Sequence, residues 1–169
     1  MKLYILRHGD AGDRGDPKYQ NDDERPLSPK GIRRTEALTR ALRELDVTFD
    51  AILSSPLVRA RETAEIVERG LRLQGHVALI EHLAPDGDVG RLVHEVNAIQ
   101  PAPDNVLLVG HEPDLSSLIA LLTTGGSQLS LTLKKGGLCR MDVASLRAGQ
   151  CASLEWLMPP GVIDEGKSS

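Results

Sequence analysis

The chain of 169 residues is 40% hydrophobic, 26% charged and 2% aromatic, which indicates one soluble globular domain with an aliphatic core. Its formal net charge of -4 gives no general electrostatic reason to bind nucleic acid or an anionic membrane surface. No segment approaches the ~18 consecutive apolar residues of a membrane span, and no basic flank with a long apolar segment opens the chain. We therefore expect a cytoplasmic protein.

Cys139 and Cys151 are too few and too far apart for a zinc site, and a disulfide would be unusual in a reducing compartment. We interpret both as buried small hydrophobic residues. A chain of this length most simply forms one domain. We expect that domain over residues 1–158, followed by a polar tail over residues 159–169.

The first apolar run, Lys2–Leu6, has β-branched and aromatic members and predicts a buried strand of a parallel sheet. The run stops at Arg7, His8 and Gly9. Open α/β sheets bind their ligands at the carboxyl ends of strands, and a glycine there lets the backbone approach a ligand closely. Alone, the tripeptide is as consistent with ordinary surface residues as with a binding site, because three residues are a weak motif.

Residues 10–25 are rich in Asp, Gly and Arg and lack periodicity, which predicts a loop over the end of this strand, as a rim or a lid. Ser28 as N-cap and Pro29 in the first position then predict a helix of about four turns. Four arginines fall on its outer face: Arg33, Arg34, Arg40 and Arg43. We interpret this face as solvated, with docking of a substrate protein as the less favoured alternative.

Three more apolar runs predict further strands: residues 49–53, 77–80 and 106–109. The helix after the first of them is expected to have Ser55 as its N-cap and Pro56 in its first position. After the second run, His82 is a candidate to line the site, and Asp88 is expected to cap a helix. Hairpin-like strands that extend the sheet, with an antiparallel edge, are predicted at residues 131–133, 137–143 and 152–157.

Arg59 lies in the first turn of the helix that follows residues 49–53. A helix dipole disfavours a cation at this end, whereas a cation beside a helix N-terminus suits a phosphate site. We therefore interpret Arg59 as a phosphate ligand, with a surface ion pair to Glu62 or Asp50 as the alternative. For Arg61 we prefer the surface ion pair.

The run at residues 106–109 ends at Gly110 and His111, which repeats the opening pattern of an apolar strand, a histidine beside glycine, and a helix. A lone histidine at a strand end is more often structural than catalytic. Two histidines at equivalent strand ends, with Arg7 beside one and Arg59 at a third end, indicate a site.

These residues resemble the signature of the histidine phosphatase superfamily, which has the phosphoglycerate mutase-like fold. The matching segments are Arg7-His8-Gly9, Ser54-Ser55-Pro56 with Arg59-Ala60 and Thr63-Ala64, and Gly110-His111. Within it, the chain looks most like the small SixA-type phosphohistidine phosphatases, through residues 7–11, 25–28 with Gly31, 83–89 and 156–159. The resemblance implies a three-layer α/β/α sandwich around a mostly parallel sheet.

The resemblance also implies a mechanism. Neutral His8 would attack phosphorus and hold the phosphoryl group as a covalent phosphohistidine, which water then hydrolyses. Arg7, Arg59 and His111 would bind the phosphoryl oxygens and neutralise their charge, so neither a metal nor a cofactor is implied. Surrounding cations should lower the pKa of His8, while bound phosphate favours a charged His111.

Many relatives carry a glutamate that protonates the leaving oxygen, and this sequence does not reproduce its surroundings. We leave the general acid open among Glu81, Asp86 and no residue. An imidazole, whose conjugate acid has a pKa of about 6.5, leaves a phosphohistidine with little help. The chain also lacks insertions for a closed cap, and an open pocket suits a phosphorylated side chain on another protein.

The leading hypothesis is thus a metal-independent phosphatase for phosphohistidine on a phosphotransfer protein. One alternative is a phosphatase of small phosphomonoesters, such as sugar or nucleotide phosphates, with Glu81 as the acid. Another is a module that recognises phosphate without turnover. The sequence leaves the oligomeric state and the closure of residues 10–25 open.

Overall fold

The computed structural model describes residues 1–126 and 128–162, whose strands form one sheet in the order β3-β2-β4-β1-β5-β6. β1 to β4 run parallel, β5 pairs antiparallel with β1, and β6 pairs antiparallel with β5. The strands are β1 (Lys2–Arg7), β2 (Ala51–Ser54), β3 (Val77–Leu79), β4 (Asn105–Gly110), β5 (Leu138–Val143) and β6 (Ala152–Met158). This confirms the mostly parallel sheet with an antiparallel edge.

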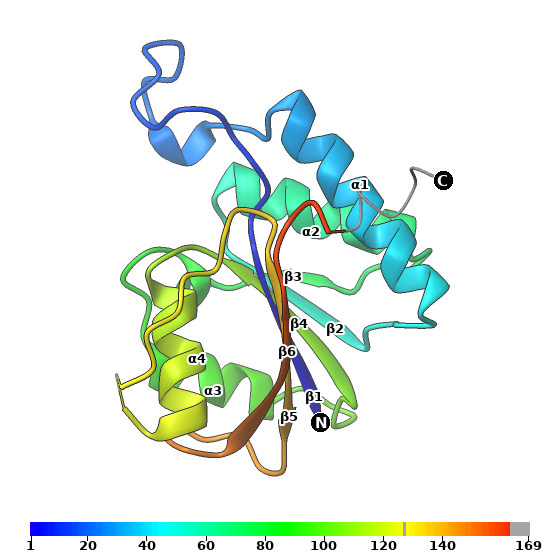
Figure 1. The fold of residues 1–169 in the computed structure, drawn as a ribbon, viewed down its shortest axis with the longest axis vertical. Helices are drawn as coiled ribbons and strands as arrows, with labels where there is room; N and C mark the ends of the chain where they lie inside the picture. Colours follow the sequence, from blue (N-terminus) through cyan, green and yellow to red (C-terminus); the bar gives the residue numbers. More distant parts are fainter. Residues whose placement is uncertain (127, 163–169) are drawn as a thin grey trace.

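Helices cover both faces of the sheet, with α1 and α2 on one side and α3 and α4 on the other (Figure 1). They are α1 (Pro29–Glu44), α2 (Val58–Gly70), α3 (Val89–Asn97) and α4 (Asp114–Thr124). Side chains alternate between the faces of a strand, so Leu3 and Ile5 join the core beneath α3 and α4. Tyr4 and Leu6 join the core beneath α1 and α2. β1, β2 and β4 are buried on both faces, as their continuous apolar runs indicate, whereas the edge strands β3 and β6 are partly exposed.

The start of α1 is fixed against the segment that follows β1. Ser28 caps the helix as predicted, because its Oγ accepts from the backbone N–H of Gly31 at 3.0 Å, and it donates to Asp10 Oδ2 at 2.6 Å. A Cβ at Gly31 would lie 2.0 Å from the carbonyl oxygen of Asp10, so only glycine allows this approach. Asp10 is two residues from His8, so α1 is packed beside the end of β1.

The predicted strand at residues 131–133 is wrong, because these residues form no strand. Side chains rather than a neighbouring strand satisfy their backbone: the N–H of Leu133 donates to Glu112 Oε1 at 2.8 Å. The carbonyl of Leu133 accepts from Arg7 Nη1 at 2.9 Å. Leu133 itself is fully buried, which explains the apolar pattern that suggested a strand.

The predicted cap of α2 is also wrong, since α2 begins at Val58 and its N-cap, Leu57, makes no side-chain cap bond. Ser55 instead accepts from the N–H of Leu57 at 3.3 Å and bonds to a ring nitrogen of His111. The cap predicted for α3 is confirmed, because Asp88 accepts from the N–H of Arg91. Of the two cysteines, Cys139 is buried as predicted, whereas Cys151 is only partly buried.

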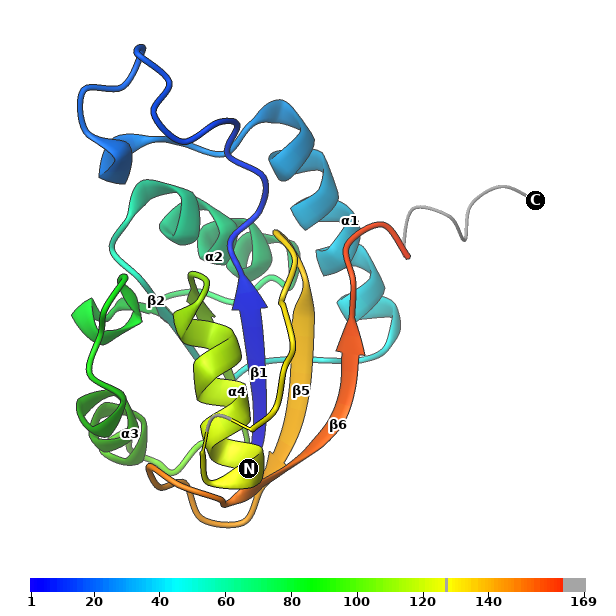
Figure 2. The ribbon, with the colours of Figure 1, turned by 60° about the vertical axis from the view of Figure 1, so that its left-hand side comes forward.

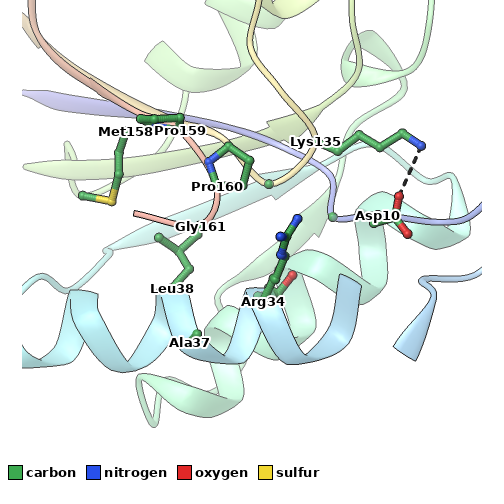
Figure 3. Close-up of a pocket in the computed structure, with 12 residues that line it drawn as sticks. Asp10, Arg34, Ala37, Leu38, Lys135, Met158, Pro159, Pro160 and Gly161 are labelled. Atoms are coloured by element: carbon green, nitrogen blue, oxygen red, sulfur yellow. Dashed lines mark hydrogen bonds and ion pairs between the residues drawn. The ribbon is translucent and has the colours of Figure 1, made fainter. Parts of the chain in front are cut away.

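The segment after β6 folds back beside α1, where Pro159, Pro160 and Gly161 line a cavity with Leu38 (Figure 3). The cavity measures about 20 Å³, enough for a water molecule and far too small for a phosphorylated substrate. Residues 163–169 of the predicted tail lie outside the described residues. Among the helices that the structure describes, none is long and apolar enough to cross a membrane.

Candidate active site

The carboxyl ends of β1, β4 and β2 lie side by side, because the register pairs Arg7 with Gly110 and Ser54 with Val109. They open into a cleft of about 340 Å³, and residues 10–25 project beyond the end of β1 (Figure 2). The cleft is lined by all four residues that the sequence singled out: Arg7, His8, Arg59 and His111. The parallel register therefore gathers side chains that are up to 104 positions apart in the chain.

His8 has one ring nitrogen bonded and the other available. Its Nδ1 donates to the carbonyl of Gly9 at 2.7 Å, which assigns the proton of the neutral ring to Nδ1 and leaves a lone pair on Nε2. The side chain is buried, and its ring centroid lies 5.1 Å from that of His111. The pKa of His8 is lowered to about 3, mainly by burial and in addition by the charges of His111, Arg59 and Arg7, while the hydrogen bond to Gly9 opposes the shift. At neutral pH the ring is uncharged and fit for nucleophilic attack.

His111 has the opposite arrangement. Its Nε2 lies 2.8 Å from Ser55 Oγ, while its buried Nδ1 has no partner among the described residues. Burial, followed by the charges of Arg59 and Arg7, lowers its pKa to about 4. A bound phosphoryl group would reverse the charge around it and favour protonation, which turns the ring into a donor of two hydrogen bonds.

The two arginines are held from opposite sides of the cleft. Arg7 bonds to Leu133, whereas Arg59, only 6% exposed, donates from Nη1 to the carbonyl of Asp22 at 2.8 Å. Each keeps a buried Nε without a partner in the described part of the chain. Buried N–H groups are nearly always bonded in folded proteins, so both guanidiniums are set to receive the oxygens of an anion. Burial lowers the pKa of both, and arginine stays charged regardless.

The alternative interpretation of Arg59, a surface ion pair with Glu62 or Asp50, is wrong in the described part of the chain, where the carboxylate beside Arg59 is that of Asp22. Glu62 instead accepts from the N–H of Leu27 at 2.7 Å, and Asp50 accepts from the backbone of residues 104 and 105. The ion pair preferred for Arg61 is found with Glu65, at 3.6 Å.

Thr63 joins α2, the helix that carries Arg59, to the segment that follows β1. Its Oγ1 accepts from the N–H of Gly9 at 3.1 Å and donates to the carbonyl of Arg59 at 2.7 Å. The side chain is fully buried. This contact gives a physical reason for a threonine four residues after the arginine in the motif.

Of the two candidate general acids, Asp86 and Glu81, only Asp86 lines the cleft. Asp86 lines the cleft, and its backbone N–H is held by Asp114 Oδ2 at 3.1 Å. Glu81 is exposed on the short 3₁₀ helix Glu81–Leu83 and does not line the cleft. His82 does not line it either and faces Glu95 at 4.0 Å, so its predicted place in the site is wrong.

Sequence reasoning missed Asp22 and Arg25, which also line the cleft. Arg25 is only 5% exposed and binds the Asp22 carboxylate through Nε at 2.8 Å. Both lie in the stretch without periodicity, so no spacing rule pointed to them. The remaining signal was an arginine directly before the Pro-Leu-Ser that opens α1.

Comparison with known proteins identifies the family. A family model described as "Histidine phosphatase superfamily (branch 1)" matches residues 3–86. Phosphohistidine phosphatase SixA of Escherichia coli (strain K12) is 31% identical over 126 residues, or 74% of this chain and 76% of that protein. This chain belongs to the histidine phosphatase superfamily.

Other relatives extend the match over nearly the whole chain of this histidine phosphatase superfamily member. An uncharacterized protein of Picosynechococcus sp. (strain ATCC 27264 / PCC 7002 / PR-6) is 38% identical over 94% of this chain and all of that protein. The structure of the protein histidine phosphatase SixA complexed with tungstate superposes with a TM-score of 0.80 at 27% identity. It covers 95% of this chain and 97% of that one, which confirms the predicted phosphoglycerate mutase-like fold.

Proposed function

We propose that this phosphatase removes phosphate from phosphohistidine on a phosphotransfer protein, with His8 as the nucleophile. The observation that carries the proposal is the His8 ring, which is neutral, has Nε2 unbonded, and lies in a cleft with two buried guanidiniums and a second imidazole. Similarity to SixA, named a phosphohistidine phosphatase, supports the substrate class. The proposal places the protein in the cytoplasm, where free thiols such as Cys139 and Cys151 persist.

In the first step, the Nε2 lone pair of His8 attacks phosphorus while the bond from phosphorus to the substrate imidazole breaks. The leaving imidazole keeps the bonding electron pair and takes a proton from solvent, and the phosphoryl group is now held on His8. In the second step, water attacks phosphorus on the opposite side from His8 and gives a proton to solvent. Inorganic phosphate leaves, and the neutral ring is restored.

Charge stabilisation comes from Arg7, Arg59 and His111. Phosphoryl transfer spreads negative charge over the three equatorial oxygens, and fixed donors aimed at them supply most of the catalysis. Among the residues that line the cleft, three buried nitrogens have no partner within the described residues: the Nε atoms of Arg7 and Arg59 and the Nδ1 of His111. Among the residues described, no cluster of three or more His, Cys, Asp or Glu side chains is placed to hold a metal ion.

The exposed face of α1 supports a protein as the substrate. The helix carries five basic and two acidic residues and all five cations are exposed, although the whole chain has a net charge of -4. Because Ser28 ties the start of α1 to Asp10, this basic face begins beside the cleft. An acidic surface around the phosphohistidine of a partner would be complementary to it.

The direct test is trapping of acid-labile phosphate on the protein with a phosphohistidine donor, for wild type and His8→Ala. Wild type should acquire label that is stable in base and lost in acid, and His8→Ala should acquire none. Label on both proteins would mean that a residue other than His8 is the nucleophile. Hydrolysis of an aryl phosphate by wild type, lost in His8→Ala, would exclude a module that only binds phosphate.

A charge reversal tests the protein substrate. Arg33→Glu with Arg40→Glu should lower kcat/KM for a phosphorylated phosphotransfer protein roughly tenfold, through slower association, and leave an aryl phosphate unaffected. Arg91→Glu, an exposed residue at the start of α3 on the other face of the sheet, is the matched control. Equal kcat/KM values for wild type, the double variant and Arg91→Glu would mean that the exposed face of α1 is only a solvated surface.

A second candidate is a phosphatase of small phosphomonoesters, which the position of Asp86 on the cleft wall favours. An alkoxide leaving group needs a proton, and a carboxyl group at the wall is placed to give it. Turnover of a phosphohistidine peptide and a panel of sugar and nucleotide phosphates separates the two. A wide margin for the panel, abolished by Asp86→Asn, would favour the second candidate.

A further inference from the structure

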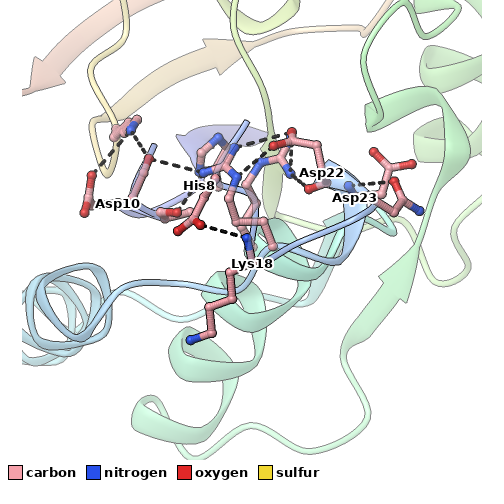
Figure 4. Close-up of polar contacts among 12 residues, drawn as sticks. His8, Asp10, Lys18, Asp22 and Asp23 are labelled. Carbon is pink, nitrogen blue, oxygen red and sulfur yellow. Dashed lines mark hydrogen bonds and ion pairs between the residues drawn. The ribbon is translucent and has the colours of Figure 1, made fainter. Parts of the chain in front are cut away.

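Arg25 joins the two ends of the loop that separates β1 from α1. Its guanidinium donates from Nε to Asp22 Oδ1 at 2.8 Å and from Nη2 to Oδ2 at 3.4 Å. From Nη1 it also donates to the carbonyls of Ala11 at 2.7 Å and Gly12 at 3.3 Å. The segment just after the nucleophile is therefore bound to the short 3₁₀ helix Asp22–Glu24 by one side chain (Figure 4).

Asp22 is in turn the partner of Arg59. Its carbonyl accepts from Arg59 Nη1 at 2.8 Å, and its Oδ2 lies 3.5 Å from the same nitrogen. The hydrogen bond from Arg25 lowers the pKa of Asp22, and the charges of Arg25 and Arg59 lower it further. One ionised carboxylate thus lies between two buried guanidiniums.

The Asp22 carboxylate reduces the electrostatic repulsion between Arg25 and Arg59. Two guanidiniums buried near each other repel, and the charge of Arg25 is one of the causes that lower the pKa of Arg59. A carboxylate between them offsets that repulsion. Asp22 also holds Arg59 at Nη1, so the Nε of the same rigid group, which has no partner within the described residues, is left for another ligand. The Arg59 guanidinium, held at Nη1 by Asp22, therefore has a fixed orientation before any anion binds.

We propose that Asp22 and Arg25 are positioning residues, which act on the phosphoryl group through Arg59 and not by touching it. The proposal rests on the proposed function in one respect, the role of Arg59 as a phosphoryl ligand. A misplacement of about 1 Å in a catalytic group can cost up to about a hundredfold in rate. Loss of either member should therefore lower activity roughly tenfold or more.

The test is a double-mutant cycle, which separates positioning from a general effect on folding. Arg25→Lys keeps the charge and removes the fork that reaches Asp22 and Ala11 together. The variant is made in wild type and in Arg59→Ala, and kcat/KM is measured for an aryl phosphate. Tungstate affinity, measured by calorimetry, is the second readout and needs no turnover.

We expect Arg25→Lys to lower kcat/KM and tungstate affinity roughly tenfold in wild type, and to have no further effect in Arg59→Ala. Asp22→Asn should likewise lower kcat/KM in wild type and not in Arg59→Ala. Arg61→Lys, whose ion pair on α2 lies outside the cleft, is the matched control and should leave both readouts unchanged.

An equal loss of kcat/KM and tungstate affinity in wild type and in Arg59→Ala would mean that Arg25 acts only on the folding of the loop. No loss in wild type would mean that Arg25 has no part in positioning Arg59. The proposed function has a separate failure. If wild type binds tungstate but turns over no phosphate compound, catalysis by His8 is wrong, while the cycle in tungstate affinity still reports on Arg25 and Asp22.

Discussion

The ends of β1 and β4 look alike in sequence but differ in their hydrogen bonds. Both follow an apolar strand and both place a buried histidine in the cleft. The end of β1 bonds Nδ1 of His8 to the next carbonyl and leaves Nε2 free. At the end of β4, Nε2 of His111 is bonded to Ser55, and Nδ1 has no partner among the described residues. Equivalent positions thus present opposite ring nitrogens, which agrees with the proposed roles of His8 in attack and of His111 in charge stabilisation.

The largest effect expected from this difference is that of His8→Ala. Removal of a covalent nucleophile costs roughly 10⁴-fold or more in kcat. Hydrolysis of an aryl phosphate should fall by that factor, and no acid-labile phosphoprotein should form. His94→Ala, an exposed histidine on α3, is the control and should behave as wild type.

His111→Ala should have the next largest effect, a loss of about a hundredfold to a thousandfold in kcat, as for one donor to a developing charge. The variant should still form the acid-labile phosphoprotein, only more slowly, as rapid quenching would show. If His111→Ala formed none while His8→Ala did, the two roles would have to be exchanged.

The two histidines should act alike on stability, because both pKa values are lowered mainly by burial, to about 3 and about 4. In the unfolded chain an imidazole titrates near 6.5. Below that pH the unfolded state binds more protons, so stability is complete above about 6.5 and falls as the pH drops towards 4. Each histidine should lower the free energy of unfolding by roughly 2 kcal/mol between pH 7 and pH 5.

Urea unfolding at the two pH values measures this loss. His8→Ala and His111→Ala should each show a smaller loss between pH 7 and pH 5 than wild type, whereas His94→Ala should match wild type. A loss that neither alanine variant reduces would mean that both rings are protonated in the folded protein at pH 5.

The smallest effect is expected for Ser55→Ala, which removes the bond to Nε2 of His111. The ring can then change tautomer, and we expect kcat to fall severalfold while phosphoprotein formation persists. Thr39→Ala removes a buried hydroxyl that bonds to Thr35 inside α1, away from the cleft, and controls for stability. An unchanged kcat in Ser55→Ala would mean that the serine does not set the tautomer.

The sequence predicted the strand ends well, because continuous apolar runs followed by Gly and His have few other interpretations. It placed Arg7, His8, Arg59 and His111 at those ends, and the parallel register brings them together. Their catalytic roles stay predictions. The tautomers were not predictable, since they depend on contacts such as that of His111 with Ser55, 56 positions away.

What the sequence did not predict depends on contacts between distant segments. Residues 131–133 have the apolar pattern of a strand, but Glu112 and Arg7 satisfy the backbone groups of Leu133. Asp22 and Arg25 lie in a loop, where function depends on a fold that spacing does not encode. Hydrogen bonds between distant segments decide both cases.

Gly31 sets a limit on how this protein can change. Its Cα hydrogen faces the Asp10 carbonyl, with no room for a methyl group, so any larger residue would push the first turn of α1 outward. His8, the proposed nucleophile, is only two residues from Asp10, and that displacement would reach it. Engineering of partner preference can therefore act on Arg33 and Arg40, which are exposed on α1, provided that position 31 stays glycine.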